Sequence, residues 1–151
     1  MEDINTSIAR AIGSKPSHAP HLATARECMT SRVITFREDQ AIREVVKTLL
    51  SKKISGGPVV NKEGKLIGLI SELDCLRALA GTAYEGHYSA HDRLVGDEMT
   101  ANCLTVTPDD DIYTMAHLFE KHSIRRLPVL ENGRLIGQVS RRDVLRTISE
   151  S

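Results

Sequence analysis

The sequence predicts an α+β protein made of two β-α-β-β-α repeats, related by a pseudo-twofold axis and packed sheet to sheet. The first observation is internal repetition: residues 29–79 align with residues 99–148 in one register, with a single residue lost in a turn. The second is that both copies follow the same order of strand-like and helical patterns. The third is size, because a unit of about 55 residues buries too little apolar surface to be stable alone.

The identical positions include the Pro and Gly residues that punctuate the pattern, which makes coincidence an inadequate explanation. They include Met29-Thr30 with Met99-Thr100, Pro58-Val59 with Pro128-Val129, Gly64 with Gly133, Gly68 with Gly137, Ser71 with Ser140, and Asp74 with Asp143.

Each copy is expected to begin with a short β-prone run, at residues 33–36 and 103–106. A helix follows in each, because apolar residues recur at helical spacing. These residues are Ile42, Val45, Val46, Leu49 and Leu50 in the first copy, and Ile112, Met115, Ala116 and Phe119 in the second. Thr107-Pro108-Asp109-Asp110 is predicted to open the second of these helices, with a cap residue, Pro at the first helical position and acid in the first turn.

A hairpin comes next in each copy. The first turns through residues 61–65, and the second turns at Asn132-Gly133, a strong hairpin signal. A closing helix is predicted from residue 71 to about residue 79, and its counterpart from residue 140 to about residue 148.

The predicted organisation therefore has four parts. Residues 1–24 form an N-terminal arm without sustained periodicity, expected to be mobile or loosely docked. Residues 25–79 form the first repeat, residues 80–94 a connector of small and polar residues, and residues 95–151 the second repeat.

Charge and cysteine content narrow the function classes. Twenty basic residues balance twenty acidic ones, which argues against binding nucleic acid or an anionic membrane. Cys28, Cys75 and Cys103 lack zinc-type spacing and are expected to be reduced thiols. No signal-like start and no run of about 18 apolar residues is found, so a cytoplasmic protein is expected.

The segment after each hairpin carries the most informative chemistry. Ser71 and Asp74, like Ser140 and Asp143, lie where a strand ends and a helix begins, and a helix N-terminus attracts anions. There the Ser hydroxyl can bond a phosphate, and the Asp can accept hydrogen bonds from two ribose hydroxyls. The alternative is local, because Ser-x-x-Asp is close to a capping box that merely stabilises the helix start.

These motifs resemble the CBS (cystathionine β-synthase) domain over about residues 25–151. The pattern that ends in Pro before the hairpin occurs as Ile54-Ser55-Gly56-Gly57-Pro58 and Ile124-Arg125-Arg126-Leu127-Pro128. The pattern after it occurs as Gly68-Leu69-Ile70-Ser71-Glu72-Leu73-Asp74 and Gly137-Gln138-Val139-Ser140-Arg141-Arg142-Asp143. The resemblance implies a tandem pair, or Bateman module, with two clefts that often bind AMP, ADP, ATP or S-adenosylmethionine.

The resemblance also implies which residues form the clefts, each combining Ser and Asp of one repeat with the first strand and Pro segment of the other. The first cleft would consist of Ser71, Asp74, Leu104, Ile124, Arg125, Arg126 and Arg142. Its arginines favour a phosphorylated ligand, and the alternative is that they form a solvated face or surface ion pairs. The second would consist of Ser140, Asp143, Thr30, Ile34, Ile54 and Ser55. It is poorer in positive charge because Ser55, Gly56 and Glu72 are taken to stand in place of Arg125, Arg126 and Arg142, so it is expected to bind AMP or another adenosyl compound, to bind weakly, or to stay empty.

The leading hypothesis is a non-catalytic regulatory module that binds AMP, ADP or ATP as a ligand rather than a cofactor. It is expected to be a homodimer that signals to a separate protein partner. The alternatives are a constitutive dimeric adaptor with ligand-free clefts and a sensor of S-adenosylmethionine or another adenosyl compound. An enzymatic hypothesis rests only on His87 and His91, which are spaced for a metal site; His122 is either a cleft-edge or a surface residue, and His18 and His21 belong to the arm.

Overall fold

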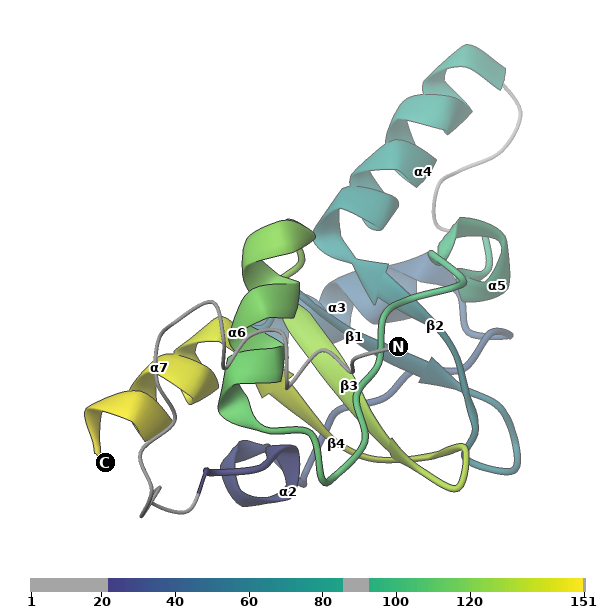
Figure 1. Ribbon diagram of the computed structural model, residues 1–151. Helices are drawn as coiled ribbons and strands as arrows, with labels where there is room; N and C mark the ends of the chain where they lie inside the picture. Colours follow the sequence, from purple (N-terminus) through teal and green to yellow (C-terminus); the bar gives the residue numbers. More distant parts are fainter. Residues whose placement is uncertain (1–21, 86–92, 151) are drawn as a thin grey trace. The chain divides into compact units, whose positions relative to one another are not determined.

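The computed structural model describes residues 22–85 and 93–150, and these residues form two compact units that do not follow chain order (Figure 1). Of the described residues, unit 2 contains 33–85, 93–103 and 133–135, and unit 1 contains 22–32, 104–132 and 136–150. Each unit holds one two-stranded antiparallel hairpin with its helices, which confirms the predicted α+β class.

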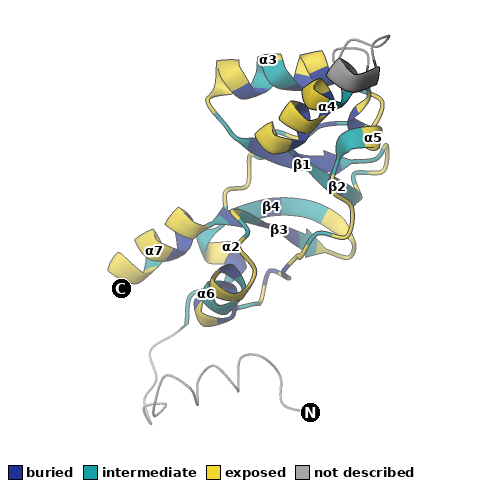
Figure 2. Cartoon of the chain, turned by 90° about the horizontal axis from the view of Figure 1, so that it is seen from above, coloured by how far each residue is buried: buried dark blue, intermediate teal, exposed yellow. Residues whose placement is uncertain are grey.

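Unit 2 is built from α3 (Ile42–Lys52), β1 (Gly56–Val60), β2 (Leu66–Ser71), α4 (Glu72–Glu85) and α5 (Val95–Glu98). The strands pair in the predicted hairpin, with Gly56 opposite Ser71. Figure 2 shows α3 and α4 on one face of this hairpin, with their buried residues toward the sheet. The core consists of Phe36, Ile42, Val45, Leu49, Val59, Ile70, Cys75 and Val95.

Unit 1 is built from α2 (Ala25–Cys28), α6 (Ile112–Lys121), β3 (Arg126–Glu131), β4 (Arg134–Ser140) and α7 (Arg141–Ser149), although the first two residues of β4 are assigned to unit 2. Asn132 and Gly133 both have positive φ, at 54° and 79°, as the predicted tight turn requires. The core consists of Ala25, Val106, Ile112, Met115, Phe119, Leu127, Val129, Val139 and Val144.

Each unit also contains a short segment of the other repeat. Unit 1 contains the segment that precedes α3, and unit 2 contains the segment that precedes α6. Thr30 donates to and accepts from Gln138 of β4 (2.8 and 3.0 Å), and Thr100 pairs in the same way with Leu69 of β2. The end of the predicted arm also docks in unit 1, where the Ala23 carbonyl accepts from the Ile112 N–H at 3.0 Å. The rest of the arm, residues 1–21, lies outside the described residues.

Three sequence predictions about element boundaries are wrong. Residues 33–36 and 103–106 are not regular strands, because each forms only one parallel bridge, Phe36 to Val59 and Val106 to Val129. The closing helix of the first repeat runs to Glu85 instead of ending near residue 79, so it enters the predicted connector.

The start of α6 is the third correction. Thr107 and Asp110 form a separate turn, in which the Thr107 N–H donates to the Asp110 carboxylate at 2.8 Å. Asp111 is the true N-cap, since its side chain accepts from the Thr114 N–H at 2.9 Å. Because Asp111 places its carboxylate where the first free N–H groups point, it replaces Thr107 as the cap.

Candidate functional site

Ser71 and Asp74 form a closed hydrogen-bonded pair at the start of α4. The Asp74 Oδ2 atom accepts from the Ser71 N–H at 2.9 Å and from the Ser71 hydroxyl at 3.0 Å. The Asp74 N–H lies 3.3 Å from the Ser71 Oγ atom that accepts its hydrogen bond. The other carboxylate oxygen, Oδ1, faces Arg77 at 3.6 Å. Asp74 is 4% exposed, so this carboxylate is held in one orientation.

Ser140 and Asp143 repeat this arrangement at the start of α7. The Ser140 side chain accepts from the Asp143 N–H at 3.2 Å, and Asp143 Oδ2 accepts from the Ser140 N–H at 2.8 Å. Together they form a capping box, and Arg146 donates to Asp143 Oδ1 at 3.0 Å.

The capping alternative is therefore realised in both units. It does not use up all the acceptors, because each carboxylate oxygen has two lone pairs. Asp74 Oδ2 already accepts two hydrogen bonds, but Asp74 Oδ1 and both carboxylate oxygens of Asp143 can still accept from a hydroxyl. Capping fixes the orientation of a carboxylate that would otherwise turn freely. A carboxylate that binds ribose hydroxyls needs this fixed orientation.

Several arginines gather where β3 and α7 begin in unit 1. Arg125 is exposed just before β3, Arg126 is the half-buried first residue of β3, and Arg142 is exposed in the first turn of α7. The sequence interpretation missed Arg141, whose Nε donates to the Ile124 carbonyl at 2.9 Å and ties these two segments together. The sequence signal that could have indicated Arg141 is the pair of consecutive arginines after Ser140.

The start of α7 also corrects one predicted correspondence between residues of the two repeats. Because α4 begins at Glu72 and α7 begins at Arg141, Glu72 stands in place of Arg141, and Leu73 stands in place of Arg142. Unit 2 thus carries an acid at this position and no counterpart to the Arg142 charge.

In unit 2, the predicted residues of the β1 side lie beside the start of α4. The Ser55 carbonyl accepts from the Glu72 N–H at 2.9 Å. Ile34 and Ile54 are half-buried and pack against the core of the unit.

The predicted site residues fall into two groups, one in each unit. Unit 2 holds Ser71, Asp74, Ile34, Ile54 and Ser55. Unit 1 holds Ser140, Asp143, Thr30, Leu104, Ile124, Arg125, Arg126 and Arg142, with Leu104 37% exposed. Each predicted cleft draws on both groups, so the two clefts stay predictions.

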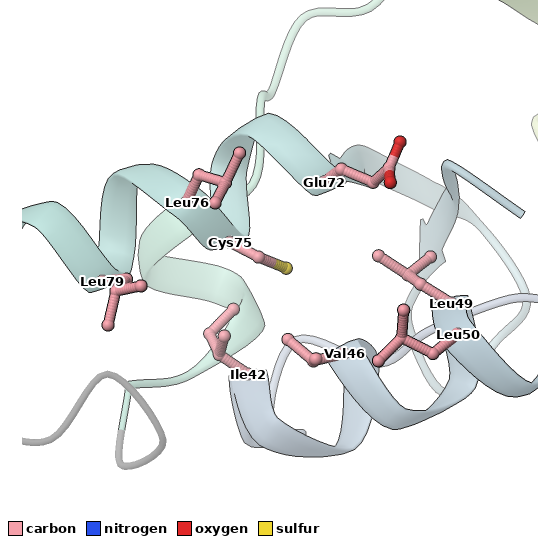
Figure 3. Close-up of a pocket in the computed structure, with 8 residues that line it drawn as sticks. All are labelled: Ile42, Val46, Leu49, Leu50, Glu72, Cys75, Leu76 and Leu79. Carbon is pink, nitrogen blue, oxygen red and sulfur yellow. The ribbon is translucent and has the colours of Figure 1, made fainter.

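An apolar groove lies elsewhere in unit 2, between α3 and α4 (Figure 3). Its volume is about 320 Å³, and its lining residues are Ile42, Val46, Leu49, Leu50, Glu72, Cys75, Leu76 and Leu79. Figure 3 shows the Cys75 sulfur pointing into the space between the helices, with the only charged lining residue, Glu72, at one end.

The three thiols are free and at least half-buried. Burial raises the pKa of Cys28, Cys75 and Cys103, and nearby carboxylates raise the pKa of Cys28 and Cys75 further. A raised pKa keeps the unreactive thiol form dominant at neutral pH.

Within residues 22–85 and 93–150, no three His, Cys, Asp or Glu side chains are grouped to hold a metal ion. His122 is an exposed residue at the end of α6. His18, His21, His87 and His91 lie outside the described residues. In the same part of the chain, no helix has the length and apolar character needed to cross a bilayer.

A family model for the CBS domain matches the chain twice, at residues 25–81 and 95–150. An uncharacterized protein of Methanocaldococcus jannaschii is 34% identical over 123 residues, which are 82% of this chain and 42% of that protein. A homoserine O-acetyltransferase of Methanococcoides burtonii is 33% identical over 123 residues, which are 81% of this chain and 23% of the enzyme. The chain thus spans less than half the length of these two curated relatives.

Two of the similar solved structures contain adenosine compounds. One is CBSX2, a CBS-pair protein of Arabidopsis thaliana, in complex with AMP: it is 28% identical, with a TM-score of 0.75 over 84% of this chain and 96% of that chain. The other is the CBS domain pair of protein MJ0100 in complex with 5′-methylthioadenosine and S-adenosyl-L-methionine. It is 25% identical, with a TM-score of 0.73 over 86% of this chain and 98% of that chain.

Proposed function

Because the chain belongs to the CBS domain family, with two tandem copies of that domain, we propose that it is a non-catalytic regulatory module for an adenosine-containing ligand. The ligand binds in clefts formed between the two repeats, and AMP, ADP or ATP is the preferred class. The similar structures that contain AMP, or 5′-methylthioadenosine and S-adenosyl-L-methionine, support the adenosine part of this proposal.

The observation that carries the proposal is the ordered carboxylate at each helix start. Asp74 and Asp143 are 4% and 6% exposed, and each has one oxygen fixed by its own helix and the other beside an arginine. A carboxylate held in this way is suited to accept hydrogen bonds from two vicinal ribose hydroxyls without an entropic cost for ordering its side chain.

The first cleft is proposed to contain Ser71 and Asp74 with Leu104, Ile124, Arg125, Arg126 and Arg142, and to prefer phosphorylated ligands. Arg141, which lies at the same edge of unit 1, belongs with these arginines. Planar guanidinium groups bind phosphate oxygens in pairs, and several at one edge favour ADP or ATP over adenosine.

The second cleft is proposed to contain Ser140 and Asp143 with Thr30, Ile34, Ile54 and Ser55. Its unit 2 side has Ser55 and Gly56 where unit 1 has arginines, so a monophosphate or an unphosphorylated adenosyl compound fits it better.

Titration calorimetry with AMP, ADP, ATP and S-adenosylmethionine tests the proposal. We expect binding of at least one compound, together with a rise in melting temperature, because a ligand at about 100 times its Kd stabilises the folded state by about 2.7 kcal/mol. Absence of heat and of any melting shift with all four compounds would refute it.

A homodimer is proposed as the working form. The helices of both units expose apolar side chains, with Leu50 74%, Leu76 60% and Leu145 65% exposed. Leu50 and Leu76 also line the groove between α3 and α4. Several leucines exposed to water are typical of a surface that a second chain covers. Sedimentation equilibrium tests this, and a monomer at micromolar concentration would exclude it.

The second candidate function is a constitutive adaptor that binds no ligand. The specific observation in its favour is that the Ser and Asp side chains already satisfy one another in both capping boxes. The calorimetric result separates the two candidates. Regulation through the ligand additionally requires a protein partner, or a second conformation, with different affinity for the bound and free forms.

A further inference from the structure

One polar side-chain atom is buried without a hydrogen-bond partner in the described part of the chain, the Oε1 atom of Gln138 in β4. A buried acceptor without a donor costs about 1–3 kcal/mol, and native structures contain few of them. The position therefore needs an explanation that the fold alone does not provide.

The strand fixes the face on which Gln138 lies. Its neighbour Val139 is 0% exposed and belongs to the core of unit 1. Because successive strand residues point to opposite faces, Gln138 lies on the face away from that core. Ser140 lies on the same face, and Thr30 is the direct backbone neighbour of Gln138. Gln138 is thus placed between two residues of the proposed second cleft.

The other repeat shows that folding does not require an amide at this position. Leu69 is the equivalent residue of β2: it pairs with Thr100 through the same two backbone hydrogen bonds (2.9 and 2.8 Å), and it precedes Ser71 by the same two positions. An apolar side chain therefore builds the same local structure, and the polar side chain of Gln138 serves another purpose.

We propose that Gln138 is a specificity-determining residue of the second cleft, and that its Oε1 atom accepts a hydrogen bond from the exocyclic amino group of the bound adenine. This inference rests on the proposed function. An adenosine ligand has two kinds of donor, its ribose hydroxyls and that amino group. Asp143 is assigned to the ribose, so the amino group is the donor left for Gln138.

The test compares Gln138→Leu with the wild type in two-site calorimetry, using adenosine and purine riboside, which lacks the amino group. The wild-type second site is expected to bind adenosine about tenfold more tightly than purine riboside, the scale of one hydrogen bond to an otherwise unpaired buried group. In Gln138→Leu, this preference disappears, and adenosine affinity falls to that of purine riboside. Inosine is a poor probe because a rotated amide can donate to its carbonyl.

Two controls separate a binding role from a structural one. The ligand-free Gln138→Leu protein is expected to melt at or above the wild-type temperature, because Leu69 already occupies the equivalent position in unit 2. The first site keeps Ser71 and Asp74 and serves as the internal reference.

Unchanged adenosine binding in Gln138→Leu, or a wild type that binds only at the first site, overturns the role of Gln138 and leaves the proposed function in place. A wild type that binds no adenosine compound at either site removes the proposed function itself.

Discussion

The carbonyl oxygen of Thr30 lies 2.9 Å from the position that a Cβ atom would take on Gly137, and the sulfur of Met29 lies 2.5 Å from it. Gly68 has the same relationship to Thr100 and Met99, at 2.9 and 2.8 Å. One close contact therefore explains why the Met-Thr pair and the glycine both occur in each repeat. The chain segment before each first helix lies directly on the glycine of a hairpin strand, and only glycine permits this approach.

Gly137→Ala is therefore expected to destabilise the protein by about 1–3 kcal/mol, because the obstructing Thr30 oxygen is backbone and cannot turn away. Urea unfolding measures this loss. Gly81→Ala in α4 is the matched control: its nearest neighbour, Arg93 Nη2, is 3.7 Å away, so it should gain about 1 kcal/mol from higher helix propensity. Equal stability of Gly137→Ala and the wild type would exclude the close approach.

Local patterns predicted the hairpins and helices because their signals lie within a few residues of one another. Asn132-Gly133 needs only its own positive φ angles, and the apolar residues of α3 and α6 need only their spacing. The assignment of Met29-Thr30 to unit 1 was beyond such reasoning, because a bridge to Gln138 depends on the tertiary structure. The extension of α4 to Glu85 was missed since adding residues to an existing helix costs little, even with Gly81 in the sequence.

The candidate site was predictable in part for the same reason. Ser-x-x-Asp spans one helical turn, so the capping box could be foreseen as an alternative from four residues. The role proposed for Gln138 could not, because burial of its Oε1 atom depends on the tertiary structure. The role of Arg141 was not predicted, because the sequence does not reveal which of the adjacent residues Arg141 and Arg142 turns toward the Ile124 carbonyl.

The start of α6 provides a second stability prediction. Asp111→Ala removes the acceptor for the Thr114 N–H (2.9 Å) and for its buried hydroxyl (3.2 Å), and is expected to cost about 1–2 kcal/mol. Asp109→Ala, at an exposed residue of the preceding turn, is the control and should change stability by less than about 0.5 kcal/mol. Thermal unfolding of both variants checks this, and a loss for Asp111→Ala no larger than that for Asp109→Ala would remove the capping role of Asp111.

Alkaline pH is expected to weaken the fold through the buried thiols. Burial raises the folded-state pKa of Cys75 above that of the unfolded chain. The unfolded state therefore loses its proton first, so the stabilising contribution is complete below the ordinary thiol pKa and is lost as pH rises through the raised value. Cys75→Ala should show a smaller fall in urea midpoint between neutral pH and pH values above the ordinary thiol pKa. An identical fall in both proteins would show that Cys75 does not contribute.

Asp74→Ala should affect binding and folding together. Loss of a charged acceptor for ribose hydroxyls is expected to weaken the first-cleft ligand by about 1.5–3 kcal/mol, and loss of the capping box should lower stability by about 1 kcal/mol. Asp143→Ala is the matched control, because it breaks the equivalent capping box but should leave the first cleft unaffected. Calorimetry below the melting temperature of both variants separates the effects. If both variants lose first-cleft affinity equally, Asp74 acts only through stability.

Arg126→Ala distinguishes a phosphate-binding role of the arginines from a solvated surface. This residue begins β3, two positions after Ile124, whose carbonyl accepts from Arg141 Nε. Removal of a guanidinium from a phosphate contact should weaken ATP or ADP by about 1.5–3 kcal/mol, the range for a hydrogen bond to a charged group, and should leave adenosine nearly unchanged. Arg43→Ala, at an exposed position of α3, controls for the general loss of one positive charge. Competition titrations with adenosine, ADP and ATP give the three affinities, and an equal loss for all three ligands would remove the phosphate assignment while leaving the Asp74 prediction intact.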